Sequence, residues 1–223
     1  MLAGRDGLTL GAQAERLGGR GERPSLGGSV RPVGMVVACY GSVVALAAGI
    51  SAALGRDPVG CESWLGTQGA ASWMISLGLG LPLGAATIAM TRIFVRRTAW
   101  AQALHEALRP AVQGTGDQAI LAVAAASATG EELLFRGLLV PWLGVVASSM
   151  IFGTLHQIRG RARWGWIVWA TVMGLLFAGL FRATGSLVGP IVAHAMINHA
   201  NLRFLRDSDP DPRPRTLGGL LRR

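Results

Sequence analysis

The feature that most constrains this chain is a series of long, continuous apolar stretches separated by short polar segments. Hydrophobic residues make up 51% of the 223 positions, and the mean hydropathy is +0.42. About 20 apolar residues are needed to cross a bilayer as a helix, and several stretches approach that length. The runs do not alternate as the strands of a membrane barrel would. The sequence therefore predicts an all-α, polytopic transmembrane helical bundle.

About six spans are predicted from these runs. They cover residues 34–54, 70–90, 119–140, 143–156, 164–181 and 187–204. Residues 98–116 carry His105, Glu106 and Arg109 among alanines and leucines, which is typical of an amphipathic interfacial helix ending near Pro110. His105 and Glu106 begin like the zinc-protease motif His-Glu-x-x-His, but Arg109 occupies the second histidine position. A solvated helix face is therefore favoured for His105.

The basic residues indicate how the chain is oriented. All 21 of them are arginine, and the net charge is +9. They gather between the apolar stretches and at the ends of the chain, which fits cytoplasmic loops and anionic lipid headgroups better than nucleic acid. With the clusters at 92–97 and 159–163 inside, both termini are predicted to be cytoplasmic. The partner expected from this pattern is the lipid bilayer, with no nucleic acid.

Three regions follow from this composition. Residues 1–33 are rich in glycine and arginine and lack an apolar period, so we predict a disordered cytoplasmic arm, with a second disordered tail at 206–223. Residues 34–205 form the membrane-embedded domain, and its chemistry-bearing motifs lie within 117–205. Cys39 and Cys61 are too few for a disulfide framework and have no metal-ligand spacing.

Charged residues interrupt the apolar stretch 119–140 at Glu131, Glu132 and Arg136. A charged side chain at the bilayer centre costs about 2.5–3.5 kcal/mol on insertion scales, so it is a functional hypothesis with a partner to be named. Helical spacing puts Arg136 on the same face as Glu132 and rotates Glu131 by about 100°. We therefore predict an ion pair between Glu132 and Arg136, and a Glu131 that faces the bundle interior.

Polar residues on the later spans are the candidates to meet Glu131. Residues four apart share a helix face, so Phe152 lies over His156, and His194 lies over Asn198. A glutamate near a histidine can activate water as a general base, whereas imidazole and carboxamide groups can donate hydrogen bonds to an oxyanion. Glutamate and histidine also ligate zinc, so residue types alone leave a three-ligand metal site open.

This polar set resembles the motifs of the CPBP intramembrane proteases, a group that includes CAAX prenyl endopeptidases and bacteriocin-processing or immunity homologues. The matching motifs are Glu131-Glu132-x-x-x-Arg136, Phe152-x-x-x-His156 and His194-x-x-x-Asn198. Each motif is short, but three in the family's order on successive apolar segments are fairly specific. The resemblance covers about residues 117–205.

The resemblance implies a glutamate-dependent peptidase. Glu131 and His156 would activate water, while His194 and Asn198 would stabilise the oxyanion. The residues implied to shape the site are Glu132, Arg136 and Phe152. The implied substrate is a peptide or protein, lipidated or membrane-anchored; no metal cofactor is favoured, and zinc is the alternative.

Intramembrane hydrolysis of a peptide bond is the function that the polar set favours. A non-catalytic peptide-binding or immunity protein is the alternative, although a binder needs no base beside an oxyanion pair. An ion or proton transporter is less favoured, because the short spans show no inverted halves. The span boundaries place His156 nearer the cytoplasmic end of its helix than Glu131 and His194 are in theirs, so the predicted site does not lie at one depth.

Overall fold

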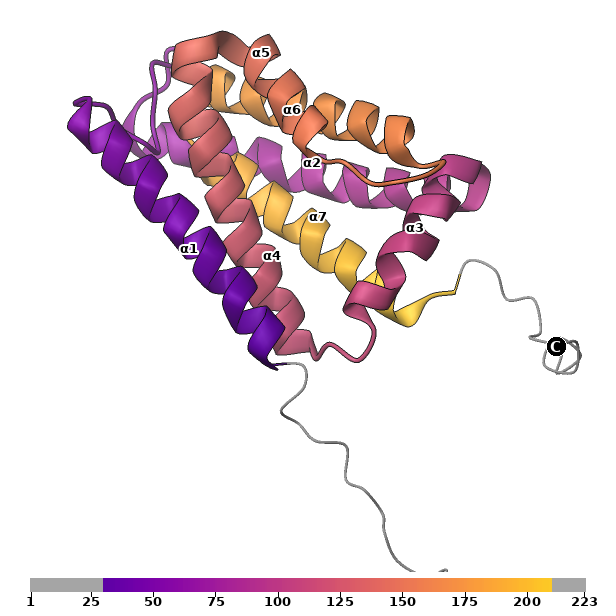
Figure 1. Ribbon diagram of the computed structural model, residues 1–223. Helices are drawn as coiled ribbons and strands as arrows, with labels where there is room; N and C mark the ends of the chain where they lie inside the picture. Colours follow the sequence, from indigo (N-terminus) through magenta and orange to yellow (C-terminus); the bar gives the residue numbers. More distant parts are fainter. Residues whose placement is uncertain (1–29, 210–223) are drawn as a thin grey trace, which may run out of the picture.

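The computed structural model describes residues 30–209, with side chains from residue 33 onward (Figure 1). Its helices are α1 (Val30–Ala53), α2 (Gly69–Arg97), α3 (Ala99–Val112), α4 (Asp117–Glu132), the π-helical η1 (Leu133–Leu139), α5 (Val140–Leu155), α6 (Arg163–Thr184) and α7 (Val188–Asp207). Across residues 30–209 there is no β-strand, although Gly60 and Ser186 form an isolated bridge. The predicted all-α fold class is confirmed.

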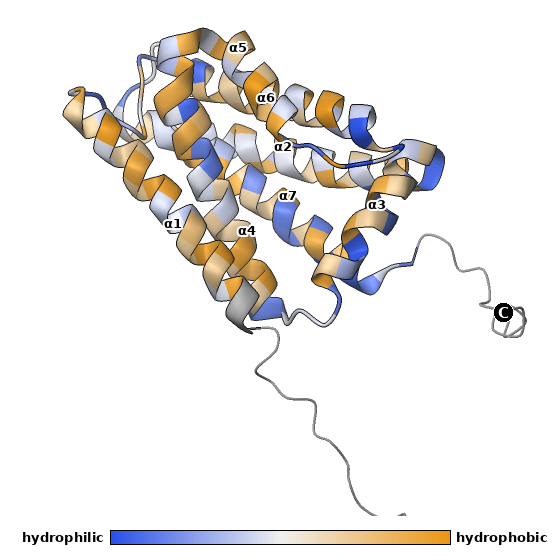
Figure 2. Ribbon diagram, in the orientation of Figure 1, coloured by the Kyte–Doolittle hydropathy of each residue, from blue (hydrophilic) through white to orange (hydrophobic). Residues whose placement is uncertain are grey.

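Helix α7 is the polar helix of the bundle, and its neighbours cover it. Four helical stretches are long and apolar enough to cross a membrane: Val33–Ala53, Gly69–Arg97, Asp117–Leu155 and Arg163–Thr184. Helix α7 is not among these four, because it carries the polar residues His194, Asn198 and Asn201. It packs against α2, α3, α4 and α6, and Figure 2 shows its hydrophilic positions between more apolar helices. The arrangement fits an integral membrane protein with a polar interior.

The third and fourth predicted spans, 119–140 and 143–156, are joined without the expected loop. The chain runs in helical conformation from Asp117 to Leu155, through η1, and bends at Gly144 (φ 78°, ψ 171°). Pro141 lies in the first turn of α5, directly after η1, and the helical conformation continues through it. The left-handed φ is one that glycine adopts readily, and the bend therefore falls at Gly144. Helix α5 then packs back against η1 and along α6.

Two other predicted boundaries differ from the structure. Helix α3 continues two residues past Pro110 to Val112, because Pro110 lies in the last turn and only the end of the helix loses a hydrogen bond. Helix α7 extends to Asp207, two residues into the predicted tail, and α1 begins at Val30. The rest of the predicted arms, residues 1–29 and 210–223, lies outside the described residues.

The loop between α1 and α2 fixes the turn that leads into α7. The Cys61 N–H donates to the Gly185 carbonyl (3.2 Å), and the Leu187 N–H donates to the Val59 carbonyl (3.0 Å). From α2, the Ser76 hydroxyl donates to the Ser186 carbonyl (3.0 Å). These bonds satisfy backbone groups at a helix end and set where α7 begins.

Helices α2 and α7 approach each other closely through glycine. A Cβ at Gly80 would lie 2.6 Å from the Gly189 carbonyl oxygen, and one at Gly84 would lie 3.3 Å from Ala193 Cα. Gly78, on the same helix, has no neighbouring atom within 4 Å of such a position. Small residues let helix backbones come together inside membranes, and here they bring α2 against α7.

We predict that Gly80→Ala lowers the stability of the protein, by about 1–3 kcal/mol, because the added methyl group meets backbone that cannot move aside. Gly78→Ala is the matched control and should be neutral or slightly stabilising, since alanine is the better helix former. Thermal or denaturant unfolding in detergent measures both. Equal stability of the two variants would contradict the close α2–α7 contact.

Candidate active site

Glu131 lies in the last turn of α4 with its two carboxylate oxygens in different surroundings. Oε1 accepts a hydrogen bond from the Tyr40 hydroxyl of α1 (2.9 Å). Oε2 is buried without a hydrogen-bond partner and lies 3.8 Å from His156 Nε2 and 3.7 Å from His194 Nε2. The structure thus brings these two histidines to one oxygen of Glu131, although the span boundaries predicted different depths. The bend at Gly144 is the physical reason, because it returns α5 toward α4.

His156 follows the last residue of α5 and is held in one orientation. Its Nδ1 lies 2.7 Å from the Phe152 carbonyl oxygen, which can only accept, so Nδ1 carries the proton. Its ring packs on Phe152 (centroids 4.4 Å apart) and on the edge of Trp166 (5.6 Å). The Nε2 atom therefore faces Glu131, with a lone pair when the ring is neutral.

His194 is oriented by the second carboxylate. Its Nδ1 lies 2.7 Å from Glu132 Oε1, and its ring stacks on Phe177 with centroids 5.2 Å apart. Glu131 and Glu132 thus approach the same histidine from different sides, as the 100° rotation between them requires. They meet opposite nitrogens of the same imidazole, which two acids on neighbouring helix positions can reach because the ring is long enough to lie between them.

The predicted ion pair between Glu132 and Arg136 is present. Arg136 Nη1 lies 3.1 Å from Glu132 Oε1, and the side chains are 1% and 0% exposed. The Arg136 Nη2 group donates to the Gly174 carbonyl of α6 at 3.4 Å. The guanidinium also lies over the Phe152 ring, 4.4 Å from its centroid, which is a favourable cation–π geometry. Phe152 thus contacts both Arg136 and His156.

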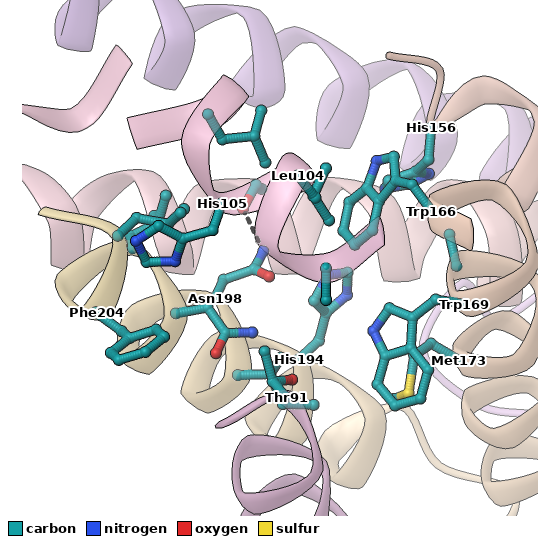
Figure 3. Close-up of a pocket in the computed structure, with 18 of the residues that line it drawn as sticks. Thr91, Leu104, His105, His156, Trp166, Trp169, Met173, His194, Asn198 and Phe204 are labelled. Atoms are coloured by element: carbon teal, nitrogen blue, oxygen red, sulfur yellow. Dashed lines mark hydrogen bonds between the residues drawn. The ribbon is translucent and has the colours of Figure 1, made fainter. Parts of the chain in front are cut away.

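Asn198 lies one turn beyond His194 and lines the same cavity. Its Nδ2 donates to the hydroxyl of Ser127 (3.0 Å), one turn before Glu131 on α4, as the dashed line in Figure 3 shows. The amide has a second N–H, which this bond leaves free to reach another acceptor. The four residues predicted to act on substrate, Glu131, His156, His194 and Asn198, therefore line one cavity.

The cavity has a volume of about 350 Å³, and the Glu131 cluster forms part of its wall. Its walls are mostly aromatic and aliphatic, and α3 covers one side with Trp100, Leu104 and Leu108. Figure 3 shows Trp166 and Trp169 near His156, with His105 and Phe204 on the other side. A site of this kind, apolar with a few convergent polar groups, is typical of ligand pockets.

His105 is buried, so the prediction of a solvated face for this residue is wrong. Its side chain is 2% exposed; Nε2 lies 3.0 Å from the Ser208 carbonyl and the ring meets the edge of Phe204. The end of α7 packs against α3 and buries it, a tertiary contact that the sequence pattern of α3 does not reveal. His105 lines the cavity but makes no contact with Glu131 that the structure records.

Two contributors were missed from the sequence. Tyr40 and Ser127 both bond to predicted site residues, but they lie in apolar stretches and belong to no motif considered above. The available signal was weak: Ser127 is four residues before Glu131, and Tyr40 is the single tyrosine of the chain. A π-helical segment, η1, follows Glu132 directly; such segments often occur at functional sites.

The described residues contain no group of three or more His, Cys, Asp or Glu side chains that could hold a metal ion. In the polar cluster, the Nδ1 atoms of both histidines and Oε1 of both glutamates are already engaged within the protein. The atoms left without a hydrogen bond are Nε2 of each ring and Oε2 of each glutamate, and of the two glutamates only Glu131 lines the cavity.

Outside the spans, local contacts shift the pKa of some groups. The Arg206 guanidinium, bonded to Asp207 at 2.6 Å, lowers the pKa of that carboxyl, and the same bonds together with Asp117 raise the pKa of Arg206. Burial raises the pKa of the Cys61 thiol. None of these groups lines the cavity.

The comparisons with known proteins concern the segment that holds this site. Residues 118–200 match the family model described as type II CAAX prenyl endopeptidase Rce1-like. This segment is Rce1-like. The match confirms the resemblance to the CPBP proteases, and the Rce1-like segment includes every residue predicted for the site, from Glu131 to Asn198.

One curated relative is "Uncharacterized protein YpbD" of Bacillus subtilis (strain 168), 35% identical over 71 residues. The alignment spans 32% of this chain and 37% of the relative, so each protein has much sequence outside it. No solved structure matches the chain. Tyr40, which bonds to Glu131, lies outside the Rce1-like segment.

We predict that Arg136→Met destabilises the protein strongly, by about 3–5 kcal/mol, because it leaves the Glu132 carboxylate buried without its cation. Arg96→Met, at an exposed position near the end of α2, is the matched control and should be nearly neutral. Denaturant unfolding in detergent gives both free energies. The same small change for the two variants would contradict a stabilising role for the buried pair.

Proposed function

We propose that this protein is an intramembrane endopeptidase that hydrolyses a peptide bond with water activated by Glu131. The observation that carries the proposal is the unpartnered Oε2 of Glu131, 3.7–3.8 Å from the Nε2 atoms of His156 and His194. These separations are too long for direct hydrogen bonds and suit a bridging water. A water between a carboxylate and imidazole is what general-base catalysis requires. The Rce1-like match supports the same reaction class.

In the proposed reaction, Glu131 takes a proton from water while the water oxygen attacks the scissile carbonyl carbon. The new C–O bond gives a tetrahedral oxyanion. Collapse of that intermediate breaks the C–N bond, and the proton on Glu131 passes to the leaving amine. His156 presents its Nε2 lone pair to the same water, because its Nδ1–H is held by the Phe152 carbonyl.

His194 and Asn198 are the proposed oxyanion donors. Asn198 uses one N–H on Ser127 and has a second for the oxyanion. His194 gives Nδ1–H to Glu132, so a hydrogen bond from its Nε2 requires the imidazolium form, with Glu132 as counter-ion. Removing one such preorganised donor typically costs about 2.7–4 kcal/mol of transition-state stabilisation.

The proposed substrate is a peptide or protein with an apolar, lipidated or membrane-anchored segment beside the scissile bond. The cavity supports this proposal, because aromatic side chains such as Trp100, Trp166 and Trp169 line it together with Glu131. An apolar substrate segment buried in this cavity would place the peptide group near Glu131. We further propose a bacterial inner-membrane location with both termini cytoplasmic, on the basis of the arginine distribution.

We predict that Glu131→Gln lowers the peptidase rate by about 100-fold or more, because it removes the general base while keeping the side-chain shape. Purified protein in detergent is incubated with a peptide that ends in a farnesylated cysteine followed by two aliphatic residues and a serine, and with the same peptide unmodified. Mass spectrometry then measures cleavage.

Glu106→Gln is the matched control for this experiment, since Glu106 is exposed on α3. It should cleave like the wild type, and all the proteins should unfold at similar temperatures. As a second readout, membrane peptides are compared between cells that express the wild type and cells that express Glu131→Gln. Full activity of purified Glu131→Gln would rule out the proposed base.

We predict that the reaction needs no bound metal. Protein treated with 1,10-phenanthroline and then freed of chelator should cleave the peptides at the original rate, because Glu131 activates water without a Lewis acid in the proposed mechanism. Elemental analysis of the active protein should show no stoichiometric zinc. Loss of activity on chelation, with recovery on addition of zinc, would contradict this part of the mechanism.

A further inference from the structure

Tyr40 is an unusual residue for its position on α1. This helix is highly apolar, and only 6% of its most apolar window is buried inside the protein, so most of its side chains face outward. Tyr40 faces inward instead and lines the cavity. Its hydroxyl donates to Glu131 Oε1 at 2.9 Å, across 91 residues of sequence. The hydroxyl of this partly buried tyrosine therefore has a hydrogen-bond acceptor, and the acceptor is the carboxylate proposed as the general base.

The hydrogen bond from Tyr40 makes the two carboxylate oxygens of Glu131 different from each other. Oε1 is occupied by the Tyr40 hydroxyl, whereas Oε2 is left toward His156 and His194 without a hydrogen bond. A free glutamate side chain has several rotatable bonds and could turn either oxygen to the cavity. With Oε1 held, the carboxylate plane is fixed and Oε2 is the oxygen that meets a water.

Close packing holds the tyrosine itself in place. Gly130 of α4 lies directly against it: a Cβ there would be 2.9 Å from Tyr40 Cδ1 and 3.3 Å from the Tyr40 carbonyl oxygen. A glycine at position 130 therefore lets α1 approach α4 closely enough for the phenol to reach the neighbouring carboxylate. Packing of this kind fixes a rotamer and preorganises the group that it supports.

We propose that Tyr40 is the positioning residue for Glu131, so that α1 completes an active site whose other members lie in the Rce1-like segment. The inference rests on the proposed function, because positioning matters for catalysis if Glu131 is the base. It goes further by assigning a role to a residue outside residues 118–200. Tyr40 acts through Glu131 and takes no part in bond making or breaking.

The kinetic test is Tyr40→Phe, which keeps the ring against Gly130 and removes only the donor. We expect kcat to fall about 10- to 100-fold, as small misplacements of reacting groups do, with KM and the unfolding temperature nearly unchanged. Ser42→Ala removes another hydroxyl from α1, one that bonds only to the Ala38 carbonyl, and should keep wild-type kinetics. An unchanged kcat in Tyr40→Phe, or an equal loss in Ser42→Ala, would overturn the proposal.

A spectroscopic test does not depend on activity. Tyr40 is the single tyrosine of the chain, so labelling with 3-fluorotyrosine gives one tyrosine fluorine resonance. We expect Glu131→Gln to shift this ¹⁹F signal, because the acceptor of the hydrogen bond changes from a carboxylate to an amide. Glu106→Gln, remote on the exposed face of α3, should leave it unmoved. An unshifted signal in Glu131→Gln would overturn the Tyr40–Glu131 contact.

The two tests separate this proposal from the proposed function. A wild-type protein without peptidase activity would count against the peptidase function, while the fluorine shift would still support or overturn the contact on which positioning depends. If the wild type is active and the fluorine signal shifts, Tyr40→Phe decides whether the contact serves catalysis.

Discussion

Buried charge is the constraint on which the rest of this structure depends. Glu132 is fully buried in a bundle of apolar helices, and a lone carboxylate there would be costly. Arg136 compensates it from the same helix, and His194 bonds to it from α7. Because one carboxylate joins α4 to α7, the height and rotation of the His194 ring relative to Glu131 are set. The proposed catalytic geometry therefore follows from the way in which a structural charge is neutralised.

Irregular backbone brings the remaining histidine to this network. The helical run from Asp117 to Leu155 contains the π-helical η1 and the bend at Gly144, which turns α5 back along η1. The Ser148 hydroxyl donates to the Phe135 carbonyl at 3.0 Å and ties the two arms of this bend together. His156, at the end of α5, thereby reaches the same oxygen of Glu131 as His194 does. A regular helix of this length would carry His156 far from Glu131, since each residue adds about 1.5 Å.

Elements outside the Rce1-like segment complete the site. Helix α1 supplies Tyr40, α3 covers the cavity with Trp100 and its neighbours, and α2 meets α7 at Gly80. The segment 118–200 carries the polar groups. Of the flanking helices, α1 holds Glu131 in the proposed orientation, α3 lines the apolar cavity, and α2 packs against α7. The polar cluster in the wall of an apolar cavity is the feature on which the proposed membrane-held peptide substrate rests.

The sequence by itself determined the fold class, the Glu132–Arg136 pair and four of the residues that line the cavity, Glu131, His156, His194 and Asn198. Apolar runs require helices in lipid, and a spacing of four residues puts two side chains on one helix face whatever the surroundings. Only the tertiary structure decided that Glu132 also holds His194, that His105 is buried, and that Tyr40 reaches Glu131. These contacts join residues on different helices, and the Tyr40 contact also depends on the close approach of α1 to α4 at Gly130. Helical periodicity carries no information about such contacts, because it describes one helix at a time.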